Sequence, residues 1–139
     1  MDMAELIQPG MVEEFKFRVE EHQTAGQVGS GSLRVLATPV MIGMMERCSH
    51  QLLAHHLDEG LTSVGIQVIV RHLAPTPCGA EVRIRSEVTA VEGSKVTFRI
   101  QAWDPVEQVG EGEHQRAVID QARFLRRVAA KIEQVGSGC

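Results

Sequence analysis

The segment from Thr38 to about residue 57 predicts a helix that is apolar around most of its circumference, and this helix constrains the fold strongly. Thr38 and Pro39 are expected to begin it, with the threonine as N-cap and the proline in the first turn. At 100° per residue one face carries only apolar and sulfur-containing side chains, namely Met41, Met44, Met45, Cys48 and Leu52. Only a narrow wedge of the surface is polar. Such a helix has to be covered by other elements.

Apolar and polar residues alternate with a period of two in five other segments, which predicts β-strands with one buried face. The predicted strands cover residues 15–19, 64–72, 82–90, 96–102 and 108–119. Gly110 and Gly112 in the last strand would permit a bend or a bulge. The connections are too short for the crossovers of parallel strands, which disfavours Rossmann and P-loop architectures. The sequence therefore predicts an α+β fold, an antiparallel sheet wrapped around the central apolar helix, in one domain spanning residues 1–139.

Three segments lie outside this pattern. Residues 21–36 are rich in glycine and serine, and we interpret them as a loop that could act as a lid. From Gln121 onward apolar residues recur every four positions among basic ones, which predicts an amphipathic helix with Asp120 as its cap. Residues 136–139 are expected to be a frayed tail.

Composition excludes several partners. The net charge of −4 comes from 18 acidic and 14 basic residues spread along the chain, so no nucleic-acid surface is expected. No apolar stretch reaches the length of a membrane span and the N-terminus lacks the features of a signal peptide, so we expect a cytoplasmic protein without a membrane segment. Cys48, Cys78 and Cys139 form no CxxC pair, which predicts free thiols. The histidines at 50–56 lack the spacing of zinc ligands, so no metal site is expected.

Three polar residues stand on faces that the pattern predicts to be apolar, where burial costs free energy unless the group is partnered or used. Thr38 could simply cap the helix, Glu46 could reach solvent or pair with His50, and His72 could be an ordinary strand-end residue. Together, a hydroxyl, a carboxylate and an imidazole are the components of a nucleophile relay. Gly65, in a strand of bulkier residues, could admit a substrate close to the backbone or could mark a bulge.

Separated blocks of the sequence carry a resemblance to a known family. The blocks are ATPVMIGMME at 37–46, VRH at 70–72 with APTP at 74–77, and GEGEHQRAVI at 110–119. In these blocks, and over residues 36–128 as a whole, the chain resembles the fluoroacetyl-CoA thioesterase family of hot-dog proteins. Agreement at several blocks with the same spacing is more specific than any single motif.

The resemblance implies a hot-dog fold and a catalytic group formed by Thr38, Glu46 and His72. It also implies that Gly65 and Arg116 contact the substrate. The expected activity is hydrolysis of short acyl-CoA thioesters by a homodimer or a dimer of dimers, with the active site near the subunit interface. No metal is implied, and coenzyme A is part of the substrate rather than a cofactor.

The chain departs from the family pattern just before the proposed active site. Residues 24–36 contain no aromatic residue where the family enzyme has an aromatic lid, and Pro39 stands where that enzyme has a glycine. Our first hypothesis is an acyl-CoA thioesterase in which Thr38 attacks the thioester or positions water, His72 transfers the proton, and Glu46 orients the imidazole or takes part covalently. The alternative is a non-catalytic hot-dog domain that binds acyl-CoA or a related ligand. A hot-dog hydratase would need an Asp/His pair that the sequence does not display.

Overall fold

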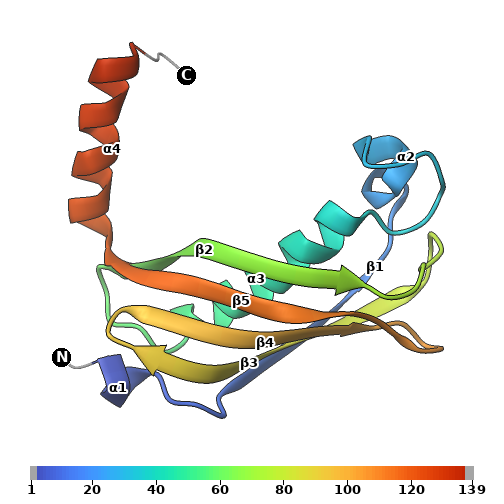
Figure 1. Cartoon of the computed structure of the whole chain (residues 1–139), viewed down its shortest axis with the longest axis horizontal. Helices are drawn as coiled ribbons and strands as arrows, with labels where there is room; N and C mark the ends of the chain where they lie inside the picture. The colour runs from blue at the N-terminus through green and yellow to red at the C-terminus, as the bar shows by residue number, and fades with distance from the viewer. Residues whose placement is uncertain (1–2, 137–139) are drawn as a thin grey trace.

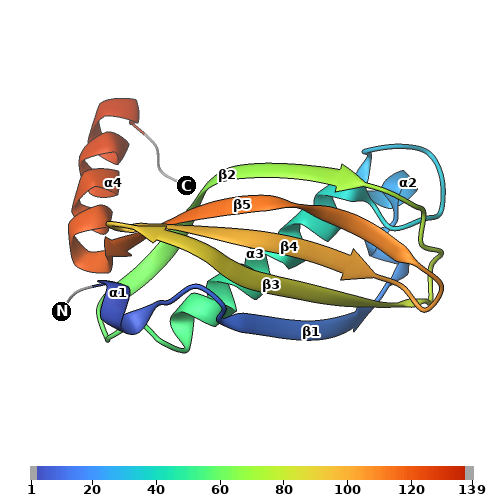
Figure 2. The same cartoon turned by 60° about the horizontal axis from the view of Figure 1, so that its bottom comes forward.

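The computed structural model describes residues 3–136 and contains a five-stranded antiparallel sheet that curves around one long helix (Figure 1). This helix is α3 (Thr38–Ala54), and the strands are β1 (Val12–Arg18), β2 (Leu61–His72), β3 (Glu81–Glu92), β4 (Lys95–Trp103) and β5 (Gln108–Asp120). The strand order is β1-β3-β4-β5-β2, and each neighbouring pair is antiparallel (Figure 2). The predicted α+β architecture is confirmed.

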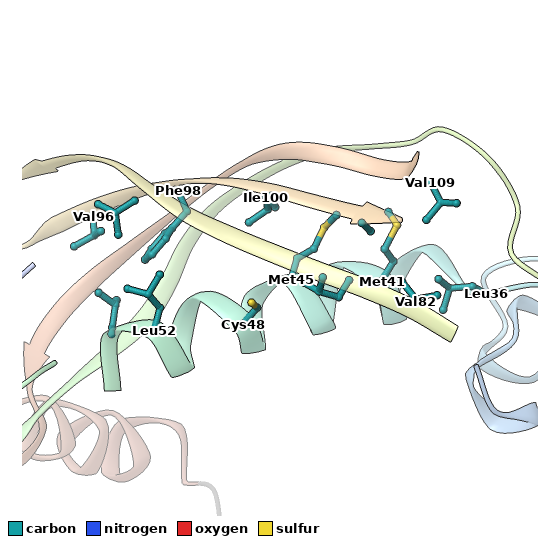
Figure 3. Close-up of a cluster of buried hydrophobic side chains, with 14 of the residues drawn as sticks. Leu36, Met41, Met45, Cys48, Leu52, Val82, Val96, Phe98, Ile100 and Val109 are labelled. Carbon is teal, nitrogen blue, oxygen red and sulfur yellow. The ribbon is translucent and has the colours of Figure 1, made fainter. Parts of the chain in front are cut away.

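The core lies between α3 and the sheet (Figure 3). Four residues of the predicted apolar helix face, Met41, Met45, Cys48 and Leu52, are at most 1% exposed, whereas Met44 is only partly buried. They pack beneath sheet residues that include Phe98, Ile100 and Val109. The helix ends at Ala54, earlier than predicted, and beyond it the amide groups of His56 and Leu57 both bond back to the Leu53 carbonyl in a tighter turn.

Strand β5 approaches its neighbours more closely than a side chain would allow. A Cβ atom at Gly110 would lie 2.6 Å from the Met41 sulfur, and one at Gly112 would lie 2.1 Å from the backbone oxygen of Ile69 in β2. The register of β4 and β5 also shifts beside Gly110, which confirms the predicted irregularity. Both glycines therefore serve close packing, and Gly112 in particular allows β2 to lie against β5.

Two helical regions differ from the sequence prediction. The segment at 21–36, predicted as a loop, contains the 3₁₀ turn η1 (Glu21–Gln23) and the short helix α2 (Ala25–Val28). Backbone bonds from Ala25 to Val35 and from Leu36 to Thr76 fold this segment against the body. The short helix α1 (Met3–Leu6) was not predicted, and it is followed by the fully buried Ile7. These elements depend on tertiary contacts that no local periodicity records.

Helix α4 (Gln121–Val135) projects from the end of β5, beside the start of β2 (Figure 1). The Asp120 carboxylate accepts a hydrogen bond from the backbone N–H of Arg123, so the predicted cap is confirmed. None of its described side chains is buried, and its exposed apolar residues are Leu125, Val128, Ile132 and Val135. Gly136 ends the helix with φ of 73°, whereas Cys139 of the predicted tail lies outside the described residues.

Two cysteines are described, and both are free thiols. Cys48 is fully buried, and burial raises the pKa of its thiol to about 12, so this residue belongs to the core. Within residues 3–136 no helix combines the length and the apolarity that crossing a membrane requires.

Candidate active site

Thr38 and His72 meet where the start of α3 lies beside the end of β2. Ala37, not Thr38, is the N-cap of α3, so the prediction that Thr38 caps the helix is wrong. The threonine is instead the first helical residue, and its hydroxyl oxygen lies 2.7 Å from Nδ1 of His72. A hydroxyl in hydrogen-bond contact with an imidazole is the geometry in which a nucleophile meets a general base.

The second ring nitrogen of His72 has no partner. Nε2 is buried and makes no hydrogen bond to any described residue. Burial lowers the pKa of His72 below the 6.5 that is ordinary for histidine, because the imidazolium form loses hydration. Within one chain His72 is therefore neutral near pH 7 and able to accept a proton. An unpaired buried nitrogen is costly, which marks it as a candidate contact for another group.

A pocket of about 360 Å³ opens beside this pair. It is lined by Ala25, Ser30, Val35, Leu36, Thr38, His72, Leu73, Ala74 and Pro75. One wall thus comes from the segment predicted as a lid and the other from the chain that follows β2. Apart from Thr38 and His72, the lining side chains are small or aliphatic, and none is Phe, Tyr or Trp.

Glu46 does not join Thr38 and His72 within the chain. It lies eight residues beyond Thr38, roughly 12 Å along the helix axis. Its Oε2 atom lies against β2, where a Cβ atom at Gly65 would come within 2.9 Å of it. The predicted alternative, a contact with His50, is wrong, because Nδ1 of His50 faces the Ser63 hydroxyl at 3.3 Å.

Arg116 lies in the same region as Glu46 and is only 6% exposed. Its guanidinium donates to the Ser63 hydroxyl at 2.8 Å, to the Ser63 carbonyl at 3.0 Å and to Nε2 of His114 at 3.2 Å. Burial lowers the pKa of Arg116 below its ordinary value, and the nearby Glu46 carboxylate only partly offsets this effect. The register of β2 shifts between Gly65 and Gln67, so the predicted bulge is confirmed.

His114 is the residue that the sequence argument missed. It is fully buried on β5, yet that strand has no continuous apolar face against which a polar residue would stand out. His114 and the buried Val118 are four residues apart on the strand, so their side chains point to the same face. This alternation is the one signal in the sequence that could have identified His114. We call Glu46, Ser63, Gly65, His114 and Arg116 the polar cluster, and Thr38 with His72 the hydroxyl–imidazole pair.

The pair and the polar cluster lie at different places along β2. From Gly65 to His72 is seven residues of strand, or roughly 20 Å. A short acyl group that contacts His72 cannot reach Gly65 of the same chain. Among the described residues no group of three or more histidine, cysteine or acidic side chains is placed to hold a metal ion.

A family model described as fluoroacetyl-CoA-specific thioesterase matches residues 19–122 of the chain. The chain belongs to this family. It is 38% identical over 97 residues to the fluoroacetyl-CoA thioesterase of Streptantibioticus cattleyicolor, a match that covers 70% of each protein. A solved variant of the fluoroacetyl-CoA thioesterase in complex with acetyl-CoA has a TM-score of 0.84 and 32% identity, and the match covers 90% of this chain and 98% of that one. A hot-dog-like protein from Thermanaerovibrio acidaminovorans has a TM-score of 0.87 and 28% identity, with coverage of 94% and 97%.

Membership in the thioesterase family confirms the resemblance inferred from the sequence blocks. It also confirms the predicted hot-dog fold and thioester hydrolysis as the reaction class. The catalytic roles of Thr38, Glu46 and His72, and the substrate contacts of Gly65 and Arg116, stay predictions.

Proposed function

We propose that the chain is a cytoplasmic thioesterase that hydrolyses short acyl-CoA thioesters with the hydroxyl–imidazole pair. The observation that carries this proposal is the 2.7 Å contact between the Thr38 hydroxyl and Nδ1 of His72 at the wall of a pocket. The structures of relatives with acetyl-CoA, or with fluoroacetate and CoA, support the substrate class. Apart from His72, the pocket wall lacks aromatic side chains, so we propose short acyl groups as a class rather than fluoroacetate alone.

The proposed chemistry begins with attack by the Thr38 oxygen on the thioester carbonyl carbon, while its proton passes to Nδ1 of His72. The positive end of the α3 dipole, at Thr38, favours the charge that develops on the carbonyl oxygen. The C–S bond then breaks, and the departing thiolate takes the proton from the imidazolium. Water, activated by the same imidazole, finally hydrolyses the acyl ester. In the alternative order the pair activates water directly, and no acyl ester forms.

We also propose that the active form is a homodimer joined along β2. This strand is at the edge of the sheet, and among the described strands it pairs only with β5. Ile66 and Ile69 on it are 52% and 59% exposed, which is unusual for large apolar residues on an edge strand. Antiparallel pairing of two copies of β2 would cover both residues and saturate the free edge. Helix α4, which projects beside the start of β2, would then extend its exposed apolar face towards the second copy.

Such pairing would complete the site. If the two-fold axis that relates the two β2 strands passes between Val68 and Ile69, the partner's Gly65 lies opposite His72. The polar cluster of one subunit then meets the hydroxyl–imidazole pair of the other, which removes the separation of roughly 20 Å within a chain. The partner's Glu46 would face the unpaired Nε2 of His72 and accept its hydrogen, and this would orient the imidazole as the sequence hypothesis expected.

Thiol release from a panel of acyl-CoA substrates tests the activity. We expect turnover of acetyl-, propionyl- and fluoroacetyl-CoA and a decline for long straight chains, because the pocket holds only about 360 Å³. A chain that binds these thioesters tightly without releasing thiol would contradict the enzymatic reading and favour the binding domain.

The titration of His72 tests the proposed contact with Glu46. A carboxylate beside Nε2 stabilises the imidazolium and raises the pKa of His72, whereas burial alone lowers it below 6.5. In Glu46→Gln only the effect of burial remains, so we expect His72 to titrate at a lower pH than in the wild type. Histidine-resolved NMR titration measures both values, and His72→Ala assigns the signal. Identical pKa values in the two proteins would show that Glu46 does not reach His72.

A further inference from the structure

His114 occupies the centre of the polar cluster and makes a polar contact with each of its two ring nitrogens. Nδ1 lies 2.8 Å from the backbone carbonyl of Gln67, and Nε2 lies 3.2 Å from the guanidinium of Arg116. The residue is fully buried, and its ring stacks on Phe98 with a centroid distance of 6.1 Å. Both polar contacts cross to groups that border Gly65.

These two contacts determine how the ring is protonated. A carbonyl oxygen only accepts hydrogen bonds, so Nδ1 of His114 carries the hydrogen that it donates to Gln67. A guanidinium only donates, so Nε2 must present its lone pair to Arg116. Only the neutral ring with hydrogen on Nδ1 satisfies both partners. The charged side chains near it are Arg116 and Glu46. Burial and Arg116 lower the pKa of His114, and together they outweigh the opposite effects of the Gln67 carbonyl and the Glu46 carboxylate.

The same two contacts determine what His114 holds in place. The contact with the Gln67 carbonyl holds the β2 bulge that begins at Gly65. The contact with Arg116 holds Nη1 of the guanidinium beside Gly65, where it would lie 3.5 Å from a Cβ atom at that residue. Ser63 anchors the other guanidinium nitrogens. Without the acceptor on His114, one end of the guanidinium would lack a hydrogen-bond partner beside Gly65.

We propose that His114 is a positioning residue. By holding Arg116 and the β2 bulge at Gly65 in place, it shapes the part of the thioesterase site that binds the acyl group. The proposal rests on the proposed function and on the predicted substrate contacts of Arg116 and Gly65. His114 takes no part in proton transfer from Thr38, because both of its ring nitrogens are engaged, one with the Gln67 carbonyl and the other with the Arg116 guanidinium. It acts through Arg116, and its loss affects how well the acyl group is bound.

Two amide variants separate the two contacts. In His114→Asn the side-chain amide nitrogen replaces Nδ1 and keeps the bond to Gln67, whereas the acceptor for Arg116 is lost. In His114→Gln the amide oxygen reaches the former position of Nε2 and can accept from Arg116. The hydrogen bond from the charged Arg116 to residue 114 is lost only in His114→Asn. We therefore expect the KM of His114→Asn for acetyl-CoA to rise roughly tenfold. Its kcat should change by less than about twofold. The glutamine variant should recover most of the lost affinity.

A structural role alone would give a different result. Both variants would then lower the midpoint of urea unfolding equally and leave the KM of the folded enzyme unchanged, and that outcome would overturn the proposal. In an Arg116→Lys background, His114→Asn should add little further increase in KM, since the partner through which it acts has been altered. Full additivity of the two changes would also overturn it.

A measurement that does not depend on hydrolysis keeps this proposal separate from the proposed function. Nitrogen-15 spectra of the histidine rings should show His114 with hydrogen on Nδ1 at neutral pH, and Arg116→Lys should shift its Nε2 signal. Hydrogen on Nε2 would exclude the inferred bond to Arg116. If no acyl-CoA were hydrolysed, the spectra would still decide whether the His114–Arg116 contact exists.

Discussion

Replacing His72 with alanine is expected to lower kcat/KM for a short acyl-CoA by roughly a thousandfold, because the Thr38 hydroxyl then has no base to take its proton. The variant should keep its fold, since His72 is only half-buried at the end of β2. Thr38→Val removes the hydroxyl at almost constant shape and should cause a loss of similar size. Thiol release measured under kcat/KM conditions gives both values.

Two controls sharpen this result. Thr38→Ser keeps the hydroxyl and should retain much more activity than Thr38→Val. His55→Ala alters an exposed histidine that contacts Glu13, and it should leave turnover unchanged. The double variant Thr38→Val with His72→Ala should be no worse than either single variant, because groups that act as a unit are not additive. Retention of more than about a tenth of the activity in His72→Ala would rule out its role as the base.

Mixed dimers of two inactive variants are expected to regain activity if the site is composite. Glu46→Ala and His72→Ala should each be inactive alone. In a mixed dimer the Glu46→Ala subunit supplies an intact hydroxyl–imidazole pair and the His72→Ala subunit supplies an intact polar cluster. About half of randomly formed dimers are mixed, and each holds one complete site of two, so about a quarter of the wild-type activity should return. Co-expression with two affinity tags isolates the mixed species.

The matched control pairs Thr38→Val with His72→Ala. Both changes fall in the hydroxyl–imidazole pair, whose Thr38 oxygen and His72 Nδ1 lie 2.7 Å apart within one chain. No mixed dimer therefore contains a complete pair, and no activity should return. Recovery in this control, or its absence in the first mixture, would contradict the proposed division of the site. Full activity of Glu46→Ala alone would place Glu46 outside the site.

The central helix and its partners were predictable because their signals are local. The apolar face of α3 identified four of its buried residues, and alternation located the strands to within a few residues. Asp120 was recognised as a cap because capping depends on neighbours three residues away. The separate conclusion, that Thr38 and His72 belong together, needed the family resemblance in addition to their unusual positions.

The remaining features depend on contacts between distant parts of the chain. Thr38 does not cap the helix, because its hydroxyl contacts His72, which is 34 residues away in the sequence. Glu46 lies beside Gly65 instead of His50, since β2 crosses the helix at that point. His114 escaped notice because its partners, Gln67 and Arg116, are brought together only by the pairing of β2 with β5.

The pocket wall built from residues 25–36 is fastened at a few backbone positions, with Ala25 and Gly26 bonded to Val35 and Leu33 and with Leu36 bonded to Thr76. The hydroxyl–imidazole pair, in contrast, stands on a long helix and a long strand. In the proposed enzyme, acyl selectivity and chemistry therefore depend on different segments of the chain. We therefore expect that substitutions in this wall would alter the range of accepted acyl groups while Thr38 and His72 keep their places.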